Sequence, residues 1–331
     1  MGCCEVNSII TYLLLEALVY PGLLAIVILV LITQWYLRKL AGRIQYRRGP
    51  TYTGPAGILQ PLADFIKLLS KEDLVNKYGL KYSPLIIIVI AIGAVISILS
   101  TTPLAPYPIY SSYDFVVIVY LLTLSPLALA YLSLSNPNPY TSIGVGRYLA
   151  LLVTSEPLFI LSLLTPIIIA SRDYGAVYSL YKSSLVSYML WTRSLASVIA
   201  MFTAAISGFI ALLAVLMVKP FDFPEAESEI YWGLFTELGG PRLALGFFLK
   251  FTEKIVFPMI YVLLFLGGTW PFTNSWILGV LIVFAKYFIV LTIIGILENT
   301  LPRYRPDQGI VFLWKYGYSL AILSLFLSLL S

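Results

Sequence analysis

The chain has 331 residues, of which 60% are hydrophobic and only 11% are charged, and its mean hydropathy is +0.91. A soluble domain carries about 25% charged residues, so a water-soluble fold is excluded because too little polar surface is available to cover it. The composition therefore predicts an integral membrane protein. The net charge of +5 does not indicate nucleic-acid binding, because the basic residues lie in short loops between apolar segments, which is typical of membrane topology.

The chain offers few ligands for a redox cofactor. It contains no histidine, and its only cysteines are the adjacent Cys3 and Cys4. Haem iron is held mainly by His, Cys or Met, and iron–sulfur clusters need several cysteines, which two neighbouring thiols do not supply. We therefore expect no cofactor, no metal and no catalytic residue in this chain. The start Met-Gly-Cys-Cys suggests lipidation, but Val6 stands where a myristoylation signal has Ser or Thr.

About eight segments are long and apolar enough to cross a bilayer, since a spanning helix needs roughly 20 apolar residues. Each is expected to be an α-helix, because every backbone N–H and C=O inside the bilayer must be satisfied within its own segment. The predicted spans are 9–36, 84–104, 115–134, 144–170, 190–218, 243–268, 276–297 and 310–330. No internal repeat, linker or soluble domain is evident, so the predicted fold is an all-α integral membrane protein with a single membrane domain, residues 1–331.

The distribution of lysine and arginine over the loops predicts the orientation. If the N-terminus is outside, the inner loops contain fourteen basic residues and the outer loops contain two, Arg172 and Lys182. The inner residues are Arg38, Lys39, Arg43, Arg47, Arg48, Lys67, Lys71, Lys77, Lys81, Arg147, Lys219, Arg242, Arg303 and Arg305. The prediction is a multi-pass protein of a prokaryotic plasma membrane with both termini outside.

The first inner loop, residues 37–83, is basic and contains a predicted amphipathic helix. Gly-Pro pairs at 49–50 and 54–55 are turn signals. Apolar residues then recur at helical spacing up to Leu69, with Asp64 and Lys67 on the polar side. Such a helix can lie in the membrane interface with arginines near the head groups. A surface helix that only anchors the subunit is the alternative.

The third inner loop, residues 219–242, is acidic. Five of the sixteen acidic residues of the chain lie in it, namely Asp222, Glu225, Glu227, Glu229 and Glu237. Asp222 followed by Glu225 predicts a helix start with Asp222 as the cap. In that helix Glu225 and Glu229 lie on one face, where like charges repel. This favours pairing with basic groups or protonation, and the alternative is a solvated acidic loop that contacts a partner.

Glu156 lies inside the fourth predicted span with apolar residues on both sides. A bare carboxylate at that depth costs at least a few kcal/mol, so it should be paired, protonated or in contact with a wet cavity. A carboxylate that can become neutral in a membrane is a natural proton-relay element, whereas a static ion pair, for which Arg147 is available on the inner side, is the alternative. In the sixth span we expect Glu253 to pair with Lys250 at i−3.

Several short motifs follow one another in the inner loops and the last span. They are RRGP at 47–50, GP at 54–55, LQPLAD at 59–64, KL at 67–68, PFD at 220–222, PEAESE at 224–229, TE at 236–237, PRYR at 302–305, DQ at 307–308 and WK at 314–315. In this order, and with Arg147 and Glu156 at the matching separation, the chain resembles the H-type membrane component of NADH:quinone oxidoreductase, respiratory complex I, which is NADH dehydrogenase subunit one in mitochondria. The resemblance covers most of the chain.

The resemblance implies an all-helical subunit that forms much of a narrow quinone-access chamber beside the peripheral arm, which holds the iron–sulfur clusters. A file of acidic residues then leads toward antiporter-like subunits. By position, the proton path would comprise Glu156, Glu225, Glu227, Glu229, Glu237 and Glu253, with Arg147. The chamber would be lined or braced by Arg38, Asp64, Lys67, Asp222, Arg303 and Asp307. The implied partners are peripheral-arm iron–sulfur and quinone-site subunits, small membrane subunits and antiporter-like subunits.

Three positions depart from the family pattern. Leu37 stands where many relatives have Glu, Lys250 stands where an acid is common, and Glu298, at the start of the inner loop 298–309, occupies a position that is often Arg. These changes affect the mouth of the expected chamber and one step of the expected acidic path. They are compatible with a different electron acceptor.

The leading hypothesis is a membrane subunit of a proton- or ion-translocating NADH:quinone oxidoreductase in which this chain itself carries no electrons. Buried acids would sense quinone reduction through changes in charge. The alternative is the equivalent membrane-anchor subunit of an ion-pumping nickel–iron hydrogenase or ferredoxin-dependent reductase that does not use quinone. A free-standing transporter or channel is a third hypothesis, because intramembrane charges alone permit it.

Overall fold

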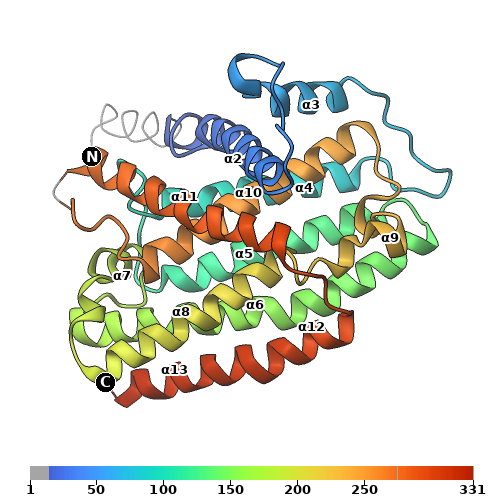
Figure 1. Ribbon diagram of the computed structural model, residues 1–331. Coiled ribbons are helices and arrows are strands. Elements are labelled where there is room, and N and C mark those ends of the chain that lie inside the picture. The colour runs from blue at the N-terminus through green and yellow to red at the C-terminus, as the bar shows by residue number, and fades with distance from the viewer. Residues whose placement is uncertain (1–14, 274, 331) are drawn as a thin grey trace.

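The computed structural model describes residues 15–273 and 275–330, and every regular element within these residues is a helix (Figure 1). Within the residues that the structure describes, seven helical segments are long and apolar enough to cross a membrane. The predicted all-α membrane fold is confirmed. Cys3 and Cys4, which bear on the lipidation signal, lie outside the described residues.

The long helices follow the predicted spans closely. They are α2 (Leu23–Ile44), α4 (Ser83–Ser100), α5 (Asp114–Leu134), α6 (Pro139–Tyr174), α8 (Leu195–Val215), α10 (Gly240–Phe265) and α11 (Trp276–Thr300). The last span consists of α12 (Pro306–Phe312), the π-helical segment η5 (Leu313–Tyr318) and α13 (Ser319–Leu330). The helix of the first span continues eight residues beyond the predicted end at residue 36, because arginine and lysine are good helix formers and continue the helix into the predicted loop.

The central helix of the bundle is α10, which corresponds to the predicted span 243–268. Its 26 residues extend about 39 Å at 1.5 Å per residue, enough to cross a bilayer. It is not among the seven apolar candidates because it carries Arg242, Lys250, Glu253 and Lys254. Every residue from 252 to 265 is buried, and α10 contacts α2, α4, α5, α6, α8 and α11. Its charges therefore face protein rather than lipid, as ionisable residues in membranes do.

The other long helices pack around α10 in three groups. The helices α6, α8 and α13 contact one another, and α4 packs on α5, while α11 packs on α2 (Figure 1). Buried polar contacts link the last span to the first group: Ser207 donates to the Gly317 carbonyl at 3.2 Å, and the Tyr318 hydroxyl donates to the Thr154 carbonyl at 3.0 Å. These bonds satisfy polar groups that would otherwise be exposed to the hydrocarbon region.

The short elements lie at the ends of the bundle. They are η1 (Pro55–Gly57), α3 (Gln60–Leu69), α7 (Leu180–Val186), η2 (Met189–Trp191), η3 (Phe223–Glu225), α9 (Glu227–Ile230) and η4 (Gly233–Phe235). Figure 1 shows α9 and α12 at one end, and α7 with the final turns of α13 at the other. We call the end with α9 the basic end, because the loops there carry most of the arginines and lysines that the sequence places inside.

A buried arginine fixes the start of α10 at the basic end. Arg242 is fully buried, and its Nε lies 2.9 Å from a carboxylate oxygen of Asp73 in the loop before α4. The guanidinium also donates to the Lys81 carbonyl at 2.8 Å and to the Ser135 hydroxyl at 3.2 Å. Because Asp73 and Lys81 belong to one segment and Ser135 to another, Arg242 ties the loop 70–82 and the α5–α6 turn to the central helix.

Candidate functional site

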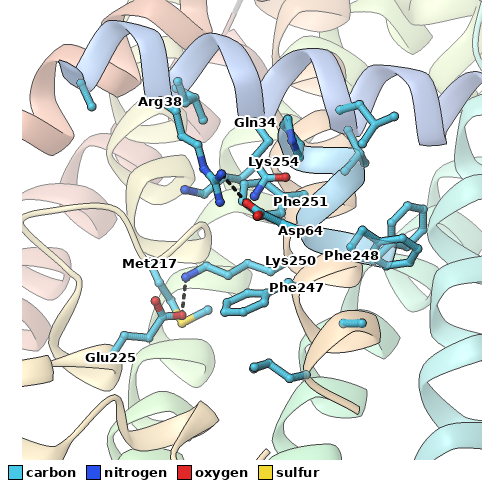
Figure 2. Close-up of a pocket in the computed structure, with 18 of the residues that line it drawn as sticks. Gln34, Arg38, Asp64, Met217, Glu225, Phe247, Phe248, Lys250, Phe251 and Lys254 are labelled. Atoms are coloured by element: carbon cyan, nitrogen blue, oxygen red, sulfur yellow. Dashed lines mark hydrogen bonds and ion pairs between the residues drawn. The ribbon is translucent and has the colours of Figure 1, made fainter. Parts of the chain in front are cut away.

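A cavity of about 750 Å³ opens at the basic end between α2, α3, α10 and the segment that follows α8 (Figure 2). Its apolar wall includes Val27, Val30 and Leu31 of α2, Leu62 and Phe65 of α3, and Phe247, Phe248 and Phe251 of α10. The lining also holds seven basic residues, Arg38, Arg47, Lys67, Lys219, Lys250, Lys254 and Arg303, and five acidic residues, Asp64, Asp222, Glu225, Glu227 and Glu298. The cavity is thus apolar with a charged wall that has an excess of two positive charges, seven minus five.

The helix α3 forms one side of the cavity and is attached to α2 and α10. Positive φ angles at Gly54 (73°) and Gly57 (77°) turn the chain into α3. Arg38 donates to Asp64 at 2.6 Å, and Gln60 donates to the other oxygen of the same carboxylate at 3.0 Å. The predicted amphipathic helix is present, and the pair of Arg38 with Asp64 ties it to α2 at the cavity, as Figure 2 shows.

The acidic loop contributes to the cavity from the opposite side. The expected continuous helix from Asp222 is wrong: Ala226 is extended (φ −59°, ψ 97°) and separates η3 from α9. Asp222 makes no cap bond and instead accepts a hydrogen bond from Arg303 at 2.7 Å. Glu225 and Glu229 consequently point to different partners, and the repulsion expected on a shared helical face is removed.

Lys250 and Glu225 form an ion pair within the cavity wall (Figure 2). The side chains of both residues are only 11% exposed, and the Lys250 ammonium lies 5.8 Å from the centroid of the Phe235 ring. One turn further along α10, Lys254 pairs with Glu298 at 3.6 Å, but the Glu298 side chain is 35% exposed. The expected pair of Lys250 with Glu253 is wrong, because Glu225 from the acidic loop takes the ammonium.

Two carboxylates lie deeper in the bundle, behind the cavity. Glu253 is 1% exposed and accepts a hydrogen bond from Ser125 of α5. Glu156 is 7% exposed, and its Oε1 atom has no hydrogen-bond partner among the described residues. Glu253 lies three residues after Lys250 on α10 and four residues before Phe257, which lines a void together with Glu156. The carboxylates therefore form a succession from the cavity wall inward.

The surroundings of Glu156 are mainly apolar. A small void beside it is lined by Leu122 and Thr123 of α5, Phe159 and Ile160 of α6, and Phe257 of α10. Pro126 in α5 removes the N–H that would bond the Leu122 carbonyl, because proline lacks this donor. The Leu122 carbonyl therefore lacks its usual helical partner, and Leu122 lines the same void as the Glu156 carboxyl group.

The remaining predicted path residues lie near the surface of the basic end. Arg147 donates to Glu229 at 2.6 Å rather than pairing with Glu156, so the alternative of a static pair between Arg147 and Glu156 is wrong. This hydrogen bond lowers the pKa of Glu229 below its ordinary value. Glu237 accepts a hydrogen bond from Asn138 at the start of α6.

The structure thus divides the predicted site residues into three groups. Arg38, Asp64, Lys67, Asp222, Glu225, Glu227 and Arg303 line the cavity. Glu156 and Glu253 lie behind it, while Arg147, Glu229 and Glu237 lie beside it at the basic end. Asp307 is exposed in the first turn of α12, a position where the helix N-terminus favours an acidic residue. It is not part of the cavity lining. Its role in bracing the chamber stays a prediction.

Sequence reasoning did not find two polar groups of this cluster. Ser125, the donor to Glu253, precedes Pro126 within a span, just as Glu156 precedes Pro157, and this shared pattern was an available signal. Tyr148 is fully enclosed, its hydroxyl has no hydrogen-bond partner among the described residues, and the charges of Glu253, Glu156 and Glu225 act on it. A single tyrosine in an apolar span gives no signal of this kind.

The fold and the site define a class of protein: a multi-pass helical membrane protein with a charged cavity at one end and carboxylates buried behind it.

The family model for NADH dehydrogenase matches residues 18–329. The H-type component of the NADH-quinone oxidoreductase of Thermomicrobium roseum is 32% identical over 312 residues, which cover 88% of each chain. NADH-ubiquinone oxidoreductase chain 1 of Patiria pectinifera is 31% identical, over 94% of this chain and 92% of that protein.

A solved structure also matches over nearly the whole chain. A chain of the membrane-bound sulfane sulfur reductase, an archaeal respiratory membrane complex, superposes with a TM-score of 0.76 and 26% identity, covering 92% of this chain and 96% of that one. The chain belongs to the NADH dehydrogenase family, in which the similar proteins are H-type membrane components of oxidoreductase complexes. The resemblance inferred from the loop motifs is confirmed.

Proposed function

We propose that this chain is the membrane subunit through which a complex I-type oxidoreductase couples reduction of a quinone to translocation of protons or other ions. The observation that carries the proposal is the succession of charged groups from the cavity inward, from Glu225 and Lys250 on the wall to Glu253 on α10 and then Glu156. The family gives the oxidoreductase context, and this geometry supports the coupling.

The cavity has the properties expected of a site for a quinone head group. Its volume of about 750 Å³ lies within the range of about 300–1,000 Å³ typical of small-molecule pockets. Aromatic side chains of α10 provide flat apolar contacts. Arginine and lysine on the wall can donate hydrogen bonds to quinone carbonyls, and the excess of positive charge would stabilise negative charge that develops during reduction.

In the proposed mechanism, electrons reach the quinone from iron–sulfur subunits of the complex, because the chain lacks the histidines and grouped cysteines that hold redox centres. Reduction of a quinone to a quinol consumes two electrons and two protons. Two unit charges 4 Å apart interact by about 4 kcal/mol at an effective dielectric constant near 20. A charge that appears in the cavity is therefore large enough to rearrange ion pairs and proton positions on its wall, and then at Glu253.

We further propose that the basic end faces the inside of a prokaryotic plasma membrane. The fourteen inner basic residues support this orientation, which places both termini outside. In this arrangement the cavity opens toward peripheral iron–sulfur and quinone-site subunits. Small membrane subunits and antiporter-like subunits would contact the lateral faces of the bundle. Glu227, Glu229 and Glu237 would connect the acidic loop to these neighbours.

Replacement of Glu156 by glutamine in the assembled complex tests the proposal. Glutamine keeps the size of the side chain but cannot take up and release a proton. We expect electron transfer to continue in liposomes while fewer ions are translocated per electron. The matched control is Glu16→Gln, because Glu16 is also buried (5% exposed) and bonds the Tyr107 N–H on another part of the bundle. Normal stoichiometry in the Glu156 variant would rule out its relay role.

The second candidate function is the same membrane subunit in a complex that does not reduce quinone. The similarity to a chain of the sulfane sulfur reductase favours it, together with Lys250 and Glu298 on the cavity wall. Purification of the complex through a tag on this chain, followed by identification of its subunits, distinguishes the two candidates. Quinone reduction that is blocked by a quinone-site inhibitor supports the first candidate, and its absence in an active complex supports the second.

A further inference from the structure

Lys250 occupies a position between two carboxylates, one on the cavity wall and one inside the bundle. We propose that Lys250 links the two by exchanging its ion-pair partner, from Glu225 in this structure to Glu253 when the charge in the cavity changes. The inference rests on the proposed coupling function and names the side chain that performs its first step. In this role Lys250 is a positioning residue rather than a catalytic one.

The existing pair is poorly hydrated, so each member depends on the other for its counter-charge. Both side chains are 11% exposed, and the ring of Phe235 covers the ammonium. A charged group in such a place does not persist without a partner, because an isolated buried charge is costly. If Glu225 takes up a proton or is attracted to another group, Lys250 must therefore find a new carboxylate.

Glu253 is the carboxylate best placed to become that partner. It lies three residues after Lys250 on α10, and residues at i and i+3 are neighbours on a helix surface. The four-carbon stem of lysine is flexible, so the exchange needs rotation of one side chain and no movement of α10. At present Glu253 accepts a hydrogen bond from Ser125, which holds the carboxylate in position beside the lysine.

The exchange has a direct consequence for protons. A proton taken up by Glu225 at the cavity removes the attraction that holds Lys250 there. In the proposed sequence Glu253 holds a proton while Lys250 is paired with Glu225. Once Lys250 approaches Glu253, it stabilises the ionised form of that carboxyl group, and the proton leaves toward Glu156. One proton enters at the cavity wall and one leaves Glu253, so charge is conserved.

Lys254 provides a matched control on the same helix. It also lines the cavity and also forms an ion pair, but its partner Glu298 is 35% exposed. Because Glu298 is partly solvated, it can stay charged without its lysine, so loss of Lys254 leaves no deeply buried carboxylate unpaired. Lys254→Met should therefore keep the number of ions translocated per electron, although loss of a lysine from the cavity wall can lower the rate of electron transfer.

The test compares Lys250→Met, Lys250→Arg and Lys254→Met in the complete complex in liposomes. Electron transfer and ions translocated per electron are measured together. Lys250→Met should transfer electrons with a large loss of ions per electron, Lys250→Arg should restore much of the ratio, and Lys254→Met should keep it. A normal ratio in Lys250→Met would overturn the inference.

If the Lys250→Met complex does not assemble, a second variant tests the inference. The double variant Lys250→Gln/Glu225→Gln removes both charges, so no buried charge is left unpaired, and it should assemble and be uncoupled. Full coupling in this variant would also overturn the inference. The Glu156→Gln variant separates the two proposals: a loss there with normal coupling in the Lys250 variants contradicts only the role of Lys250, whereas normal coupling in Glu156→Gln contradicts the proposed function itself.

Discussion

The ion pair between Arg242 and Asp73 should show an unequal response to removal of its two members. Arg242 is fully buried, whereas the Asp73 side chain is 24% exposed. Asp73→Ala leaves a guanidinium that cannot lose its charge in a buried site. Removing one partner of a buried pair in this way costs about 3–5 kcal/mol. The remaining bonds to Lys81 and Ser135 do not replace the counter-charge.

Removal of the arginine should be milder. In Arg242→Met the methionine fills most of the volume, and Asp73 can turn toward water. The loss is then that of hydrogen bonds to Asp73 and Lys81, which reach solvent, and to the buried Ser135 hydroxyl, about 1–3 kcal/mol. The two variants remove the same contact, so the expected difference in their stability comes from the unequal burial of Arg242 and Asp73. This difference tests the geometry at the basic end.

Thermal unfolding of the complex and proteolysis of the loop 70–82 measure both effects. We expect the lower unfolding temperature and the faster cleavage in Asp73→Ala, with Arg242→Met intermediate. Glu72→Ala is the matched control, because Glu72 is exposed in the same loop, and it should behave like the unmodified protein. The reasoning is refuted if Arg242→Met is as destabilising as Asp73→Ala, or more so.

Three further predictions concern contacts around the site. Arg147→Gln should raise the pKa of Glu229 toward its ordinary value, as measured by NMR of labelled glutamate. Because the folded-state pKa of Glu229 is lowered, the pair stabilises the folded protein at pH values above the ordinary pKa of glutamate. This stabilisation is lost as the pH falls through the lowered pKa. An unchanged pKa of Glu229 in the variant contradicts this reasoning. Gly144→Ala places a Cβ 2.7 Å from the Gly233 Cα and should cost about 1–3 kcal/mol of stability, which a normal unfolding temperature would disprove. Arg38→Met should accelerate hydrogen exchange in α3 with little effect on global stability, since an exposed pair contributes about 0–1 kcal/mol; unchanged exchange in α3 would count against the role of this pair.

The spans could be predicted from sequence because the hydrocarbon thickness imposes a length and a composition on every lipid-facing helix. The same rule recognises α10 less well. Its four charged residues are permitted only because other helices enclose it, and the neighbours of a helix are not written in its own sequence. Extension of α2 to Ile44 was missed for a related reason: a basic, helix-forming segment at the interface does not show by composition where the helix ends.

The partners of the charged site residues could not be predicted. Local spacing suggested Glu253 for Lys250, but the structure pairs Lys250 with Glu225, 25 residues away. Arg147 pairs with Glu229, 82 residues away. Both outcomes depend on the non-helical backbone conformation of Ala226. This one residue interrupts the helix of the acidic loop, so that its carboxylates point in different directions. Family motifs identified which residues gather at the cavity, and only the structure shows how they are paired.

The most direct measurement of the coupling account is infrared spectroscopy of the complex in its oxidised and reduced states. If electrons remain in partner subunits while Glu253 and Glu156 respond to them, the difference spectrum contains carboxyl bands of both residues. Glu253→Gln and Glu156→Gln should each remove one of these bands. Difference spectra that are identical in the unmodified complex and in both variants would contradict a response of the buried carboxylates to the redox reaction.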